Sequence, residues 1–119
     1  MITKHTFDES PIDKYQLKRA TKLQKRNGYM LFGWRQREKC HYPCTFGIAH
    51  TYYIIHGCCQ IKAEKTDQMI TLNAGEYAYL PRGNYSFWFE SENTEYVTLI
   101  DELPQEFVDS YNIENIDVD

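Results

Sequence analysis

Short segments rich in aromatic and β-branched residues alternate with turn signals between residues 29 and 100, and this pattern limits the fold most strongly. The turn signals are Gly57, residues 65–67, residues 73–75, residues 81–83 and residues 91–93. Strands at this spacing, with almost no helical periodicity, are typical of a β-sandwich or β-barrel. The segments that we expect to be strands are residues 29–37, 43–46, 51–55, 58–64, 69–72, 76–80, 85–90 and 95–100.

The two ends of the chain lack this pattern. We expect residues 1–28 to form an amino-terminal arm, irregular over residues 1–13 and a short helix or basic loop over residues 14–26, where helix formers carry a ragged apolar stripe. We expect residues 103–119 to form an acidic tail with one helical turn at residues 105–111. We also expect the 119 residues to make a single domain with its core at about residues 29–100.

Aromatic residues make up 15% of the chain, and ten of them are tyrosines. Such side chains suit the lining of a pocket for a partly polar molecule. No signal peptide is visible, and no apolar run approaches the roughly 20 residues that span a membrane. We therefore expect a cytoplasmic protein with no membrane partner, in which the four cysteines are free thiols.

Charge is distributed unevenly along the chain. Residues 14–39 hold nine of the 13 basic residues and one acid, whereas residues 90–119 hold ten acids and no base. The two segments can lie against each other, within one chain or across a dimer, or the basic one can bind nucleic acid. The first interpretation is favoured because the net charge is −4 and no nucleic-acid motif is present.

A spaced frame of glycine and proline lies within the turns. Gly75, Pro81 and Gly83 follow the pattern Gly-x5-Pro-x-Gly, in which glycine supplies turn dihedrals and proline stiffens a strand end. This frame resembles the second sequence motif of the cupin superfamily, and Gly57 fits the closing glycine of the first motif. The resemblance implies an all-β jelly-roll barrel, the cupin double-stranded β-helix, across about residues 29–100.

The residues at the metal-ligand positions of those motifs differ from the cupin pattern. Ser86 stands at the histidine position and Glu90 at the asparagine position of the second motif, and His50 stands at the glutamate position of the first. The resemblance thus implies a barrel without a metal or other cofactor. The paired histidine positions of the first motif fall on Cys44 and Phe46, or on Pro43 and Thr45.

Within the superfamily, residues 42–46 and 52–57 are most similar to the ethanolamine-utilisation (EutQ-like) cupins. A Tyr-Val-Thr segment at residues 96–98 also matches that family, whose members lack the usual metal ligands. His50 and His56 stand where the family tends to have carboxylates, and Cys44 stands where it has tryptophan. The phosphotransfer activity attributed to that family is therefore not carried over to this chain.

His50 and Tyr52 are the predicted catalytic residues. The frame points His50 into the barrel, and strand alternation puts Tyr52 on the same face. A histidine beside a tyrosine in a cavity can act as an acid/base pair near neutral pH. The alternative is a core histidine that only hydrogen-bonds a neighbour.

Further side chains are expected to line a ligand site. Cys44 and Ser86 occupy former ligand positions and should face inward, and Trp88 shares the face of Ser86. Either Arg35 or Arg37 would supply a cation for an anionic ligand. The predicted ligand-binding set is Arg35, Arg37, Cys44, Phe46, Tyr77, Tyr79, Ser86 and Trp88.

An improvised metal site is the main chemical alternative. Cys44 and His50, aided by Cys40 or His41, have the ligand types that suit zinc. Their spacing matches no strong zinc pattern, so we expect no metal. Nucleophilic catalysis by Cys44 would need a base such as His50 to hold the thiolate.

Together these features predict a metal-independent, homodimeric cupin that binds a small, anionic molecule in its barrel. If the protein is an enzyme, the expected reaction is proton transfer or isomerisation of the epimerase type. One alternative is a non-catalytic sensing or interaction module whose barrel is filled by its own side chains. Another, less favoured, is nucleic-acid binding through residues 14–39.

Overall fold

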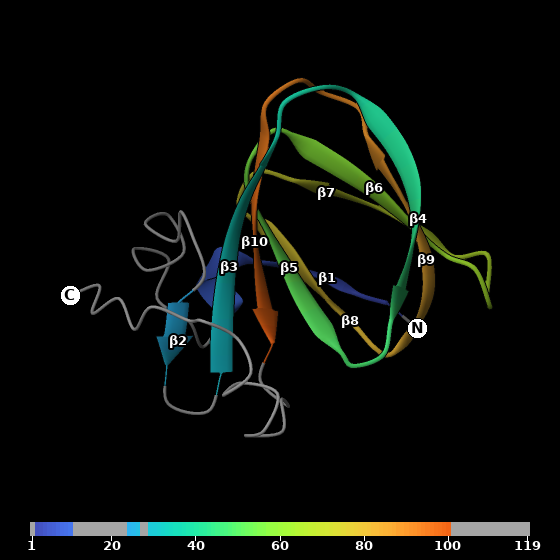
Figure 1. The fold of residues 1–119 in the computed structure, drawn as a ribbon, viewed down its shortest axis with the longest axis horizontal. Coiled ribbons are helices and arrows are strands. Elements are labelled where there is room, and N and C mark those ends of the chain that lie inside the picture. The colour runs from blue at the N-terminus through green and yellow to red at the C-terminus, as the bar shows by residue number, and fades with distance from the viewer. Residues whose placement is uncertain (1, 11–23, 27–28, 101–119) are drawn as a thin grey trace.

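The computed structural model of the chain describes residues 2–10, 24–26 and 29–100 (Figure 1). Nearly all of these residues are in strands, because the aromatic and β-branched segments pair side by side. The strands predicted between residues 29 and 100 are confirmed to within a few residues. The elements are β1 Lys4–Thr6, the short 3-10 helix η1 Phe7–Glu9, β2 Gln24–Arg26, β3 Tyr29–Gln36, β4 Cys40–Phe46, β5 His50–His56, β6 Cys58–Ala63, β7 Met69–Asn73, β8 Glu76–Leu80, β9 Gly83–Phe89 and β10 Thr94–Ile100.

Two antiparallel sheets face each other, as Figure 1 shows. One has six strands in the order β1-β8-β5-β10-β3-β2, and the other has four strands in the order β4-β9-β6-β7. From β3 onward the chain crosses between the sheets at almost every turn, and only β6 and β7 are consecutive strands of one sheet. The predicted all-β jelly roll is confirmed.

Side chains on the facing surfaces of the two sheets form the barrel interior, here called the inner cluster. Its buried members are Ile2, Phe46, Tyr52, Ile54, Cys59, Ile61, Leu72, Ala78, Leu80, Tyr85, Phe87, Phe89 and Tyr96. A second cluster, here called the outer cluster, covers the opposite face of the six-stranded sheet. It consists of Leu31, Tyr53, Val97 and Leu99, with Phe7, Ile55 and Tyr77 packed against it.

The turn at Gly57 requires a glycine. Its φ angle is +85°, and a Cβ placed there would lie 2.7 Å from Thr94 Oγ1 and 2.8 Å from Ser91 Oγ. Any larger residue would therefore combine backbone strain with a steric overlap. Thr94 itself is fully buried, and its hydroxyl reaches the carbonyl oxygen of Cys58 at 3.4 Å.

The amino-terminal segment is more regular than expected. Residues 1–13 were predicted to be irregular, but β1 pairs with β8, with Lys4 opposite Ala78, and η1 follows directly. Gln24–Arg26 forms strand β2 rather than part of a helix or loop. Each strand pairs with the backbone of a neighbouring strand at an edge of the six-stranded sheet, β1 with β8 and β2 with β3. Pairing at a sheet edge depends on the folded sheet, so local sequence patterns do not reveal it.

The remaining expectations for the chain ends fall on residues 11–23 and 101–119, which lie outside the described residues. In the part of the chain that is described, no helix has the length and apolar character needed to span a bilayer.

Candidate functional site

His50, Phe46 and Tyr52 come together at one end of the barrel. His50 begins β5 and Phe46 ends β4, so the short loop between these strands brings the two rings together. The imidazole of His50 stacks on the Phe46 ring, with centroids 4.1 Å apart. Tyr52 follows on the same face of β5, with its ring centroid 5.8 Å from Phe46 and 6.5 Å from His50. The predicted shared inward face of His50 and Tyr52 is confirmed.

The backbone fixes the orientation of the half-buried imidazole of His50. Nδ1 lies 2.9 Å from the carbonyl oxygen of Ile48, an acceptor that favours the tautomer with hydrogen on Nδ1. Burial lowers the pKa of His50, and the hydrogen bond to Ile48 opposes this only in part. The ring is therefore neutral near pH 7, and its Nε2 carries a lone pair.

Three tyrosines place their hydroxyl groups in the barrel interior. Tyr52 stacks on Tyr96 at 5.5 Å, and the side chain of Tyr42 lies close to that of Tyr96. Burial raises the pKa of Tyr42, Tyr52 and Tyr96, so all three phenols stay protonated and can donate hydrogen bonds. Sequence reasoning missed Tyr42 and Tyr96. Strand alternation could have identified Tyr42, because it places Tyr42 on the same face as Cys44 and Phe46.

Cys44 packs against the inner cluster, as expected, and lies opposite Tyr85 in the pairing of β4 with β9. Burial raises the pKa of its thiol. The same effect raises the pKa of the fully buried Cys59 thiol to about 12. Thiols in this environment stay protonated and are poor nucleophiles. Cys44 and Cys59 therefore act as small apolar side chains in the barrel interior.

Ser86 and Trp88 lie on the outer face of the four-stranded sheet, so their expected inward orientation is wrong. Trp88 stacks on His41 at 4.3 Å, and the Ser86 hydroxyl donates to Glu64. The inward positions of β9 belong to the three aromatic side chains that alternate with them, Tyr85, Phe87 and Phe89. Burying these three rings fixes which face of β9 is inside.

Tyr77 and Tyr79 share a face, but it is the outer face of the six-stranded sheet. Tyr77 stacks on Tyr53 at 4.8 Å, and Tyr79 is 46% exposed. In the register, Tyr79 lies opposite Thr51, whereas the inward-facing Tyr52 lies opposite Ala78. These tyrosines are therefore separated from the barrel interior by the sheet itself.

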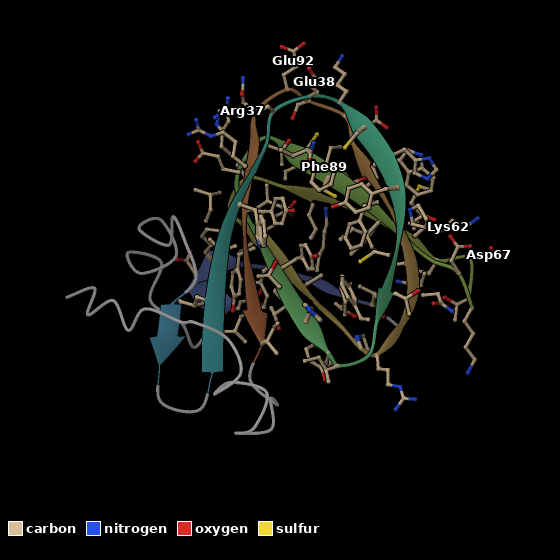
Figure 2. The ribbon with its side chains drawn as sticks, viewed as in Figure 1. Arg37, Glu38, Lys62, Asp67, Phe89 and Glu92 are labelled. Carbon is tan, nitrogen blue, oxygen red and sulfur yellow. The ribbon has the colours of Figure 1, made fainter. Side chains whose placement is uncertain are left out.

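Neither Arg35 nor Arg37 faces the barrel interior. Arg35 lies opposite Glu95 in the pairing of β3 with β10, and its guanidinium is ion-paired with that carboxylate. Figure 2 shows Arg37 on the outside of the barrel, near Glu38, whereas Phe89 points between the sheets. The expected inward orientation of an arginine is therefore wrong, because Arg35 shares a face of β3 with Leu31 of the outer cluster.

The inner cluster has few groups suited to metal binding. Across residues 2–10, 24–26 and 29–100, no three His, Cys, Asp or Glu side chains are grouped so that they could hold a metal ion. His41, one of the ligands of the alternative zinc site, stacks on Trp88 outside the barrel.

A jelly roll with aromatic side chains between its sheets is the architecture of a cupin. A family profile described as the EutQ-like cupin domain matches residues 25–97. The chain belongs to this family. No curated protein matches the sequence.

Several solved structures share the fold at low sequence identity. A cupin-2 domain protein from Shewanella frigidimarina is 20% identical, with a TM-score of 0.54 over 66% of this chain and 74% of that one. A DUF861 family protein from Thermotoga maritima is 13% identical, with a TM-score of 0.56 over 82% of this chain and 97% of that one. The EutQ protein of Clostridium difficile is 10% identical, with a TM-score of 0.52 over 82% of this chain and 65% of that one. At these identities the likeness concerns the fold alone.

Proposed function

We propose that this protein binds a small uncharged molecule at the end of the barrel formed by Phe46, His50 and Tyr52, without a metal ion. The observation that carries the proposal is the half-buried, neutral imidazole of His50, held by Phe46 and by the Ile48 carbonyl. Among the described residues, its Nε2 has no hydrogen-bond partner. That atom is therefore available to accept a proton or hydrogen bond from a ligand.

An uncharged ligand is favoured by the composition of the interior. Among the described residues, the buried polar side chains are Thr51, Ser86, Thr94 and Thr98, and no Lys, Arg, Asp or Glu is buried. An anion there would lose its hydration without gaining a charged partner. The expected anionic ligand relied on Arg35 or Arg37, and both lie outside. Protonated phenols, aromatic faces and one imidazole instead suit a neutral molecule that carries a hydrogen-bond acceptor such as a carbonyl.

The same geometry supports proton transfer as a second candidate. With Nδ1–H held by Ile48, Nε2 of His50 is the basic atom and can take a proton from a carbon beside a ligand carbonyl. The protonated hydroxyl of Tyr52 is the donor suited to the carbonyl oxygen, where negative charge then develops. Such an isomerisation needs no metal, and His50 and Tyr52 keep their predicted catalytic roles in it.

The main alternative is that the barrel is filled by its own side chains and that the protein is a non-catalytic interaction module. It is supported by the close ring packing of Tyr52 with Phe87 at 5.2 Å and of Phe89 with Tyr96 at 5.5 Å. Homodimerisation, a cytoplasmic location and the less favoured nucleic-acid binding also stay predictions. Four of the nine basic residues on which the last depends lie in residues 14–23, outside the described residues.

Native mass spectrometry of gently purified protein, followed by thermal-shift screening, tests the proposal. The screen compares uncharged carbonyl compounds with carboxylates of matched size. We expect stabilisation by members of the uncharged set, lost in His50→Ala and kept in the control His56→Ala, which changes the exposed histidine at the other end of β5. A bare protein mass together with no stabilisation by either set would favour the filled barrel.

A further inference from the structure

The residues that precede β1 close the same end of the barrel at which His50 lies. Ile2 is 6% exposed and belongs to the inner cluster, together with Phe46, Tyr52 and Leu80. The pairing of β1 with β8 is antiparallel and sets Lys4 opposite Ala78. Leu80 in turn lies opposite His50 on β5. Because Ile2 precedes Lys4 by two residues and Leu80 follows Ala78 by two, Ile2 lies toward the end of the barrel where Leu80 and His50 are paired.

One side chain holds the backbone of Ile2 in this position. The amide N–H of Ile2 donates to Oε1 of Gln68 at 2.8 Å, and Nε2 of Gln68 donates to the Ile2 carbonyl oxygen at 2.5 Å. Gln68 directly precedes β7 of the four-stranded sheet. In Figure 1 the amino terminus accordingly ends beside that sheet, although β1 itself belongs to the six-stranded sheet. The segment thus bridges the two sheets at the rim.

The other contacts of residues 2–6 are made by Lys4, His5 and Thr6. His5 packs on Tyr77 with ring centroids 5.3 Å apart, and the Thr6 amide donates to Glu9 at 2.9 Å. Strand β1 has three residues and one neighbour, β8. Lys4 pairs with Glu76 at 3.3 Å and donates to the Thr71 carbonyl oxygen at 3.3 Å, but its side chain is 46% exposed. Exposed contacts of this kind contribute little to stability. Removal of the two Gln68 bonds would therefore leave the buried Ile2 side chain as the main contact that fixes this end of the segment.

The segment is held more firmly at its other end. The amide of Phe7 donates to the Gly75 carbonyl oxygen at 2.9 Å, and the Phe7 ring packs on Tyr53 at 5.7 Å. The hydroxyl of Ser10 is bonded to that of Tyr53 at 2.9 Å. A segment that is held by many contacts at one end and by few at the other opens first at the weakly held end.

We propose that residues 2–6 are a latch over the His50 end of the barrel, which pivots near Thr6 and Phe7 and admits ligand when Gln68 releases Ile2. The latch proposal rests on the proposed function only for the kind of molecule that enters the barrel. Its opening is a property of the protein alone.

Chemical modification of histidine by diethyl pyrocarbonate, located by mass spectrometry, measures the opening without the natural ligand. The reagent is small and reacts with neutral imidazole. The modification rate of His50 measures opening of the latched end. His56, which is exposed at the opposite end of the same strand, is the internal control. The variant is Gln68→Leu, and its matched control is Gln60→Leu on the outer face of β6. The free energy of unfolding of each variant is measured in urea.

We expect Gln68→Leu to raise the His50 modification rate about 5- to 30-fold, the range produced by losing one or two stabilising contacts. The rate at His56 and both rates in Gln60→Leu should not change. Ile2→Ala, which keeps both backbone bonds, should give a smaller increase. Gln68→Glu, which keeps the acceptor for the Ile2 N–H, replaces Gln68→Leu if that variant does not fold.

Unchanged His50 modification in both Gln68 and Ile2 variants would overturn the latch. An increase that only matches the loss of global stability would overturn it too, because the segment would then open only when the whole domain unfolds. The proposed function fails separately, through the ligand screen. If Gln68→Leu raises the His50 modification rate but no compound in the screen binds, the latch is supported and the proposed function is not.

Discussion

The imidazole of His50 lies against the phenyl ring of Phe46 with a centroid distance of 4.1 Å and an interplanar angle of 19°. This contact joins the end of β4 to the start of β5, and therefore one sheet to the other. It gives His50 two separable roles, as a packing partner and as a hydrogen-bonding group. Substitutions can test the two roles independently.

His50→Phe should keep the stacking and remove Nε2. We expect the free energy of unfolding to change by no more than about 0.5 kcal/mol, while ligand binding is lost. His50→Ala removes the stacking as well and should cost about 1 kcal/mol. Urea denaturation and the thermal-shift screen measure both quantities. Retained binding in His50→Phe would show that the histidine is only a packing residue.

The stability of the protein should depend on pH through His50. Its pKa is lowered in the folded state, so above about pH 6.5 the imidazole is neutral in both states and has no effect. Below that pH the unfolded chain binds the proton first, and the free energy of unfolding falls until the pH passes the folded-state pKa. Urea titrations at pH 7.5 and 5.5 should show this loss in the native protein and a smaller loss in His50→Phe. Equal losses in both proteins would contradict it.

Neighbouring residues of β9 should differ sharply in their effect on stability. Phe87 is fully buried in the inner cluster, so Phe87→Ala should cost about 3–5 kcal/mol. Trp88 lies on the outer face against His41, so Trp88→Ala should cost much less and leave ligand binding unchanged. The comparison is made by urea denaturation. A larger loss for Trp88→Ala would mean that the two faces of β9 are assigned the wrong way round.

Removal of metal should have no effect on the protein. Across the described residues no three suitable side chains could hold an ion together. We expect dialysis against EDTA to leave the melting temperature and ligand binding unchanged, and elemental analysis before dialysis to find well below one ion per chain. Near-stoichiometric zinc or iron, with a lower melting temperature after dialysis, would contradict the metal-independent proposal.

Local sequence patterns located the strands and turns because each depends on neighbouring residues. The +85° φ angle at Gly57 and the alternation from His50 to Tyr52 are both consequences of residues close in the chain. These patterns also placed His50, Tyr52, Cys44 and Phe46 on inward-facing positions. The cupin frame of Gly75, Pro81 and Gly83 had the same local origin.

The tertiary structure alone decided which face of β8 and β9 is inside. Both faces of these strands carry apolar or aromatic residues, so alternation shows only that Tyr77 and Tyr79, or Ser86 and Trp88, share a face. The competition to bury Tyr85, Phe87 and Phe89 between the sheets settled the orientation of β9. It displaced Ser86 from the position that the frame suggested.

Long-range pairing likewise decided the role of the amino-terminal segment. Ile2 and Gln68 are 66 residues apart, and their bonds form only because β1 adds to β8 and crosses toward β7. The residues near Ile2 carry no hydrophobic period that would indicate a strand. The edge of β8 that pairs with β1, and the position of Gln68 beside Ile2, exist only in the folded barrel.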